Sequence, residues 1–67
     1  MELGSLICSR RKARGLTQEQ LAEAVGVARQ TVSKWETGET VPDAESLGKL
    51  ASVLGFSVDR ALGLGRR

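Results

Sequence analysis

The sequence is poor in the residues on which most catalytic and metal sites depend. It has no histidine, no tyrosine, and one residue each of cysteine, phenylalanine and tryptophan. A single cysteine excludes an intramolecular disulfide and fits a reducing compartment. Without histidine or a cysteine pair, the chain offers neither the usual metal ligands nor a nucleophile beside a base. We therefore predict no catalytic residue, no metal and no cofactor.

Long hydrophobic runs are also missing. No apolar stretch approaches the roughly 18 residues of a membrane span, and no signal-peptide pattern opens the chain. We therefore expect a cytoplasmic protein with no membrane partner. The 67 residues leave room for one small domain, which we assign to the whole range 1–67.

The charge is modest in total but uneven along the chain. The net charge is +2, and the isoelectric point near 9.2 is basic enough to favour nucleic acid as a partner. Arg10, Arg11, Lys12 and Arg14 have no acid between them, whereas five of the eight acidic residues lie at or after Glu36. This basic run is either a solvated helix face or a phosphate-binding surface. Like charges at such density repel on a helix, so we favour phosphate contact.

The apolar pattern predicts short helices and no strand. A first helix is expected over 3–13, with its core edge at Leu3, Leu6 and Ile7. A later helix, capped by Asp43, carries the cleanest amphipathic pattern, at Leu47, Leu50, Ala51 and Leu54. A last short helix is expected after Ser57, followed by a frayed tail over 63–67.

The most informative motif spans about 17–37, which reads as two short helices joined by a tight turn. Thr17 and Gln20 have the spacing of a capping box, and Gly26 falls where that helix needs a left-handed end. A second apolar face restarts after the turn, at Val32 and Trp35. This i, i+3 spacing predicts that the tryptophan packs in the core and does not stack on a base.

The run from Leu3 to Leu62 resembles the phage repressor/Cro-type, or lambda repressor-like, helix-turn-helix family. The shared elements are Arg11, GLTQ at 15–18, Leu21-Ala22, Gly26-Val27, RQTVSKWE at 29–36, Gly38, Pro42 and LGKLASVLG at 47–55. The resemblance implies an all-α, compact bundle of five helices that binds operator DNA, usually as a dimer.

The resemblance also implies roles for individual residues. Arg29, Gln30 and Lys34 match positions that read base edges in the major groove, where Gln suits adenine and Arg or Lys suits guanine. By the resemblance or by their place in the basic run, the residues expected to contact the DNA backbone or support the site are Gln18, Thr31, Ser33, Arg10, Arg11 and Arg14. Arg11 and Glu36 match a structural ion pair between the first helix and the end of the recognition helix. The alternative for the base-reading set is a solvated helix face.

Three positions depart from the family pattern. Ala28 stands where the recognition helix usually has a Ser or Thr cap, and the missing cap should cost about 1 kcal/mol. Glu39 occupies a loop that often carries Lys or Arg, and Arg10 replaces a residue that is often apolar. We therefore expect moderate affinity for each half-site, compensated by a homodimer whose interface is formed by Val58, Ala61, Leu62 and Leu64.

These observations predict a sequence-specific transcriptional regulator that binds double-stranded operator DNA as a homodimer on a pseudo-palindromic site. We expect it to act as a repressor. The alternative is an antitoxin with a toxin partner, or a protein-interaction adaptor built on the same fold. A neighbouring toxin gene or a co-purifying partner would favour the antitoxin. A folded chain that does not bind duplex DNA at low salt would favour the adaptor.

Overall fold

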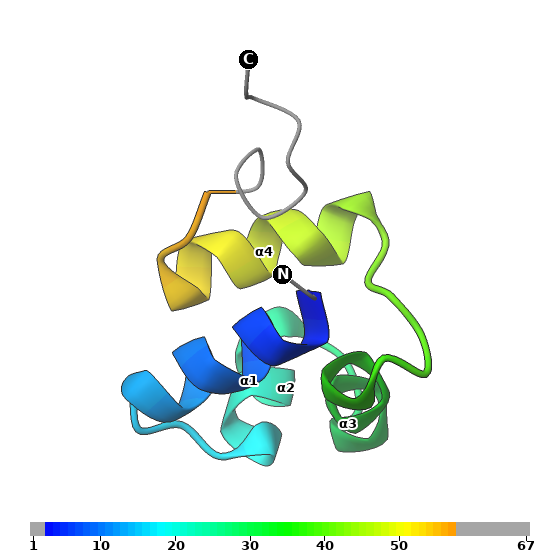
Figure 1. Cartoon of the computed structure of the whole chain (residues 1–67), viewed down its shortest axis with the longest axis horizontal. Coiled ribbons are helices and arrows are strands. Elements are labelled where there is room, and N and C mark those ends of the chain that lie inside the picture. The colour runs from blue at the N-terminus through cyan, green and yellow to red at the C-terminus, as the bar shows by residue number, and fades with distance from the viewer. Residues whose placement is uncertain (1–2, 58–67) are drawn as a thin grey trace.

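The computed structural model describes residues 3–57, which form four helices with no strand among them (Figure 1). The helices are α1 (Leu3–Ala13), α2 (Gln18–Val25), α3 (Arg29–Thr37) and α4 (Ala44–Leu54). The all-α prediction is confirmed, and α1 has the predicted bounds. Outside the described residues lie the expected fifth helix, the 63–67 tail and the predicted interface residues Val58, Ala61, Leu62 and Leu64.

The helix termini follow short-range chemistry, with one exception. The Oγ1 of Thr17 accepts from the Gln20 N–H at 3.0 Å, while the Thr17 N–H donates to Gln20 Oε1 at 2.9 Å. At the start of α4, Asp43 Oδ1 accepts from the Ser46 N–H at 2.9 Å. Glycines with left-handed backbones end α2, α3 and α4, at Gly26, Gly38 and Gly55. The exception is the start of α3, where Ala28 provides no side-chain cap.

The core forms where the apolar sides of the four helices meet. Its buried residues are Ile7, Leu21, Ala22, Val25, Val32, Trp35, Leu50 and Leu54. Trp35 is only 4% exposed, so the prediction that it packs in the core is confirmed. Leu16 and Phe56, which lie outside the helices, pack against this core as partly buried residues. The burial of these side chains, at about 25 cal/mol per Å² of apolar surface, is the main favourable contribution to folding.

The packing leaves one side of α3 free of the core. α3 packs against α1 and α2, and α4 also packs against α1 and α2. In Figure 1, α4 lies along the top of the bundle, α3 lies at the lower right, and the loop over 38–43 joins them. The two helices of the predicted motif, α2 and α3, are therefore held by α1 and α4 together.

The first turn of α1 approaches α3 very closely. A Cβ built on Gly4 would lie 2.5 Å from the carbonyl oxygen of Trp35 and 2.8 Å from that of Glu36. Only a residue without a side chain permits this approach. Gly4 thereby sets how near the N-terminal end of α1 comes to the C-terminal end of α3.

Candidate nucleic-acid interface

α3 is anchored through its apolar side and presents polar side chains on the other. Val32 is fully buried within the core, next to the nearly buried Trp35. The three predicted base readers on this helix, Arg29, Gln30 and Lys34, are all exposed. The fold therefore gathers them on the side of α3 that faces away from the core.

The middle of this outward side carries small polar residues. Ser33 and Thr37 follow Gln30 at i+3 and i+7, so the three lie in one row along the helix. Ser33 and Thr31 are half-buried, whereas Thr37 is exposed and its Oγ1 donates to the Lys34 carbonyl at 3.2 Å. Thr37 was not among the predicted site residues. Its i+7 spacing from Gln30 is the signal that would have found it.

A hollow lies between α2 and the start of α3. Its lining residues are Glu19, Ala22, Glu23, Val27, Arg29 and Gln30. The two exposed carboxylates of α2 therefore lie beside the first two residues of α3. A carboxylate repels a phosphate but accepts a hydrogen bond from the amino group of cytosine. The hollow consequently suits a base edge better than the sugar-phosphate backbone.

Arg11 and Glu36 form an ion pair between α1 and the end of α3. The Arg11 Nε lies 2.6 Å from Glu36 Oε2, and the Arg11 Nη2 lies 3.2 Å from Glu36 Oε1. The two side chains are only 12% and 6% exposed. The guanidinium also donates to the Leu16 carbonyl at 2.8 Å and to Cys8 Sγ at 3.8 Å. Most of the N–H groups of Arg11 are thus used inside the fold.

Glu36 has a second partner from α2. The Nε2 of Gln18 donates to Glu36 Oε1 at 3.0 Å. Burial raises the pKa of the Glu36 carboxyl, but hydrogen bonds from Arg11 and Gln18 and the positive charge of Arg11 outweigh it and lower the pKa below its ordinary value. The hydrogen bond to Glu36 raises the pKa of the Arg11 guanidinium. Both groups are therefore charged at neutral pH.

The other basic residues of α1 lie on the surface. Arg10, Lys12 and Arg14 are all exposed. The guanidinium of Arg14 lies over the C-terminal end of α4, because a Cβ built on Gly55 would be 2.5 Å from its Nη2. A cation in this place interacts favourably with the carbonyl groups at the helix end, which gives Arg14 a supporting role. Of the α1 residues predicted to contact DNA, Arg10 is left as the candidate for phosphate contact.

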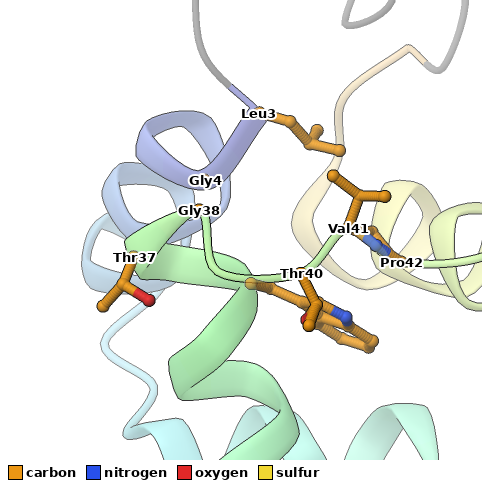
Figure 2. Close-up of a pocket in the computed structure, with 8 residues that line it drawn as sticks. Leu3, Gly4, Thr37, Gly38, Thr40, Val41 and Pro42 are labelled. Carbon is orange, nitrogen blue, oxygen red and sulfur yellow. The ribbon is translucent and has the colours of Figure 1, made fainter.

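A groove of different character lies at the C-terminal end of α3 (Figure 2). Its lining residues are Leu3, Gly4, Trp35, Thr37, Gly38, Thr40, Val41 and Pro42. Figure 2 shows the side chains of Leu3 and Val41 on facing sides of it, and Val41 is 75% exposed. None of these eight residues is charged. The groove therefore offers no cation for a phosphate, and it shares only Thr37 with the outward side of α3.

Two other features are absent from the described part of the chain. Within residues 3–57, no group of three or more His, Cys, Asp or Glu side chains is placed to hold a metal ion. No helix in this range has both the length and the apolar character needed to cross a membrane.

Comparison with known sequences identifies regulators of transcription. A family profile described as helix-turn-helix matches residues 9–60. The chain is 39% identical over 62 residues to the HTH-type transcriptional activator BcrR of Enterococcus faecalis, covering 92% of this chain and 30% of BcrR. It is 35% identical over 63 residues to the cryptic phage CTXphi transcriptional repressor RstR of Vibrio cholerae, covering 94% of this chain and 56% of RstR. The chain thus spans about a third of one relative and just over half of the other.

Solved structures share the fold. The P22 c2 repressor, solved in complex with a synthetic operator, superimposes with a TM-score of 0.88 at 36% identity, covering 96% of this chain and 97% of that one. The N-terminal DNA-binding domain of SinR from Bacillus subtilis gives a TM-score of 0.81 at 34% identity, covering 90% of this chain and 88% of that one. These similarities show a lambda repressor-like fold. The chain therefore belongs to the Cro/C1-type helix-turn-helix family of DNA-binding transcriptional regulators.

Proposed function

We propose that this chain is a sequence-specific, double-stranded-DNA-binding regulator that acts as a homodimer on a pseudo-palindromic operator. The placement of α3 carries the proposal, because its apolar side is buried while Arg29, Gln30 and Lys34 are exposed on the other. The major groove of B-DNA, about 12 Å wide, admits an α-helix that presents such side chains. The N-terminal residues of a recognition helix lie nearest the base edges. Arg29 and Gln30, the first two residues of α3, hold that position.

The chemistry of these side chains supports distinct roles. The amide of Gln30 matches the donor and acceptor of adenine, and Arg29 or Lys34 matches the two acceptors of guanine. Thr31 and Ser33 are assigned to the DNA backbone or to a thymine methyl group. Phosphate contacts are assigned to Gln18 at the start of α2 and to Arg10 on α1, with Arg11 and Arg14 in support.

We propose repression as the direction of regulation. The activator BcrR is matched over only 30% of its own length, so most of BcrR has no counterpart in the similarity. The repressor RstR is matched over 56% of its length, and the solved P22 c2 repressor chain, bound to a synthetic operator, shares the fold with a TM-score of 0.88. Blocking a promoter by occupancy needs nothing beyond the DNA-binding surface. No catalytic role and no cofactor is part of this proposal, which treats residues 1–67 as one domain acting in the cytoplasm.

The alternative of an antitoxin or protein-interaction adaptor stays a prediction. It differs from the proposed function in its partner, because it needs a bound protein whereas the proposed function needs only duplex DNA. The test is to co-express the chain with the products of its neighbouring genes and to purify it. A toxin that co-purifies in stoichiometric amount would support the antitoxin alternative.

The proposed function is tested by selecting bound duplexes from a random pool. We expect a pseudo-palindrome with two equivalent half-sites. Gln30→Ala should reduce the binding free energy on the selected sequence by about 1–3 kcal/mol and relax the preference at one base position. Arg10→Ala should weaken binding to all sequences equally. Equal losses on selected and random DNA for Gln30→Ala would remove it as a base reader.

A matched control uses two exposed lysines. Lys34→Ala should reduce affinity for the selected site, because the side chain is on the outward side of α3. Lys49→Ala removes the same charge from α4, where its Nζ lies 3.7 Å from Glu45 Oε2. Lys49→Ala should leave the affinity for the selected site unchanged. If both variants lost affinity alike, α3 would not be the recognition helix.

A further inference from the structure

The carboxylate of Glu36 joins three helices through hydrogen bonds. It accepts from the Arg11 Nε at 2.6 Å, from the Arg11 Nη2 at 3.2 Å and from the Gln18 Nε2 at 3.0 Å. Arg11 belongs to α1, Gln18 is the first residue of α2, and Glu36 lies near the end of α3. The hydrogen bond between Gln18 and Glu36 lies outside the ion pair and connects α2 to the end of α3.

This bond fixes the orientation of the Gln18 amide. A carboxylate only accepts hydrogen bonds, so the amide nitrogen, not its oxygen, must face Glu36. The amide group is planar and carries two N–H bonds. Once one of them is directed to Glu36, the direction of the other is set. A long side chain that would otherwise sample several rotamers is thereby held in one.

The start of α2 is a suitable place for a fixed donor. The first N–H groups of a helix have no partner within the helix, and the dipole there favours an anion. The Gln20 N–H is already used by Thr17 Oγ1. The remaining backbone N–H groups of the first turn and the second N–H of the Gln18 amide can therefore donate to one phosphate together.

Arg11 removes the electrostatic obstacle to this arrangement. An unpaired carboxylate beside the start of α2 would repel a phosphate. Arg11 compensates the charge of Glu36 in a pair that is only 12% and 6% exposed. Two of its other contacts, to the Leu16 carbonyl and to Cys8 Sγ, keep the guanidinium inside the fold. The donor left to meet the DNA from this cluster is Gln18.

We propose that Glu36 is a positioning residue, which orients Gln18 to donate to a DNA phosphate at the start of α2. This inference rests on the proposed function, because it needs duplex DNA as the ligand. A phosphate contact carries no base information, so Glu36 strengthens binding to every sequence alike. The same carboxylate therefore stabilises the fold and contributes to the sequence-independent affinity for DNA.

The experiment compares the effect of Gln18→Ala in three backgrounds, with the full chain and a random-sequence duplex at one fixed salt concentration. The backgrounds are the wild type, Glu36→Met, and the double variant Arg11→Met, Glu36→Met. In the wild type, loss of a hydrogen bond to a charged group should weaken binding by about tenfold. In both backgrounds that lack Glu36, we expect the further effect of Gln18→Ala to be less than about twofold, since a freely rotating amide contributes little.

The double variant separates positioning from stability. Glu36→Met leaves Arg11 buried and unpaired, so this background is expected to be destabilised, whereas replacing both partners by apolar residues of similar size is often neutral or stabilising. Denaturant unfolding shows which proteins are folded at the assay temperature. If Glu36 acted only on stability, the effect of Gln18→Ala would return to its wild-type size in the double variant. That result would overturn the inference.

Failure of the inference and failure of the proposed function give different results. A wild-type chain that binds no duplex would overturn both. A wild type that binds normally, but is insensitive to Gln18→Ala, would overturn the inference alone, because recognition through α3 would still operate.

Discussion

Two glycines in helices illustrate how much the surroundings of a single residue matter. Gly4 in α1 and Gly48 in α4 both occupy ordinary helical positions, where glycine is a poor choice by intrinsic propensity. A Cβ on Gly4 would meet two backbone carbonyls of α3 at 2.5 and 2.8 Å, whereas a Cβ on Gly48 would meet nothing within 4 Å. Backbone atoms cannot move aside as a flexible side chain can.

The same substitution is therefore expected to have opposite effects at these two positions. Gly4→Ala should destabilise the protein by about 1–3 kcal/mol, because it forces α1 away from α3. Gly48→Ala should stabilise it by up to about 1 kcal/mol through helix propensity. Denaturant unfolding of both variants gives the two values. A stabilising Gly4→Ala would show that the approach of α1 to α3 is looser than described.

The start of α3 offers a second test at the residue scale. Ala28 has the extended backbone of an N-cap, with φ −76° and ψ 152°, but no side-chain oxygen. Ala28→Ser should add about 1 kcal/mol of stability and raise the melting temperature by about 4–8 °C. Ala24→Ser, within α2, is the matched control and should be neutral or slightly destabilising. Equal melting temperatures for the two variants would contradict capping.

At the scale of the helices, the ion pair between Arg11 and Glu36 is the main polar connection. It ties the last turn of α1 to the end of α3, and the hydrogen bond from Gln18 adds α2. Each of these elements is only 8 to 11 residues long and would be marginal alone in water. Packing and this polar connection together hold the angle between α2 and α3, and hence the position of the recognition helix.

The pair predicts a dependence of stability on acid. The pKa of Glu36 in the folded protein lies below its ordinary value of 4.5, so at low pH the unfolded chain binds more protons than the folded one. The free energy of unfolding should therefore decrease as the pH falls from about 4.5 through the folded pKa. Asp43, whose pKa is lowered by the Ser46 backbone N–H, contributes with the same sign.

Chemical unfolding as a function of pH, in the wild type and in Glu36→Gln, isolates this contribution. The amide cannot titrate, so the variant should be less stable at neutral pH and should lose less stability on acidification. Asp43 is present in both proteins and serves as the common background. Parallel curves for the two proteins would mean that Glu36 has the same pKa folded and unfolded.

At the scale of the whole molecule, the proposed homodimer can be tested at its interface. A core of this size supplies only about 3–5 kcal/mol, so the proposed partner subunit would add stability. The interface predicted from sequence lies outside residues 3–57, at Val58, Ala61, Leu62 and Leu64. A second surface, the uncharged groove of Figure 2, lies within the described residues and exposes Val41.

Two charge insertions distinguish these surfaces. Leu62→Glu should dissociate the dimer if the predicted interface is correct, whereas Val41→Glu should leave it intact. Sedimentation equilibrium at high protein concentration measures both. If only Val41→Glu dissociates the dimer, the interface lies at the groove and not at the predicted residues. If the wild type is a monomer, the proposed homodimer is wrong.

The geometry of a dimer on DNA gives a further expectation. Two recognition helices related by a two-fold axis reach successive major grooves about 34–36 Å apart. Inserting five base pairs, about half a helical turn, between the half-sites places them on opposite sides of the duplex. Affinity should then fall to that of a single half-site, and a ten-base-pair insertion should cost as much, because it moves the half-sites about 34 Å further apart than a compact dimer can reach. Unchanged affinity with either insertion would indicate independent monomers.

Much of this architecture follows from interactions that are local in the chain. Thr17 with Gln20, Asp43 with Ser46, and the glycine that ends α2 are all read within three or four residues, and apolar spacing locates the core. The exposure of the predicted base readers follows from the same spacing, since a helix that buries Val32 and Trp35 must turn Gln30 outward.

Contacts between distant residues had no such local signal. Gln18 and Glu36 are 18 positions apart, and the Arg11 pair, 25 positions apart, was expected only by resemblance. The place of Arg14 over Gly55 and the need for glycine at position 4 were likewise set by how the helices pack. Helix packing joins surfaces far apart along the chain, and their fit depends on three-dimensional shape that periodicity does not encode.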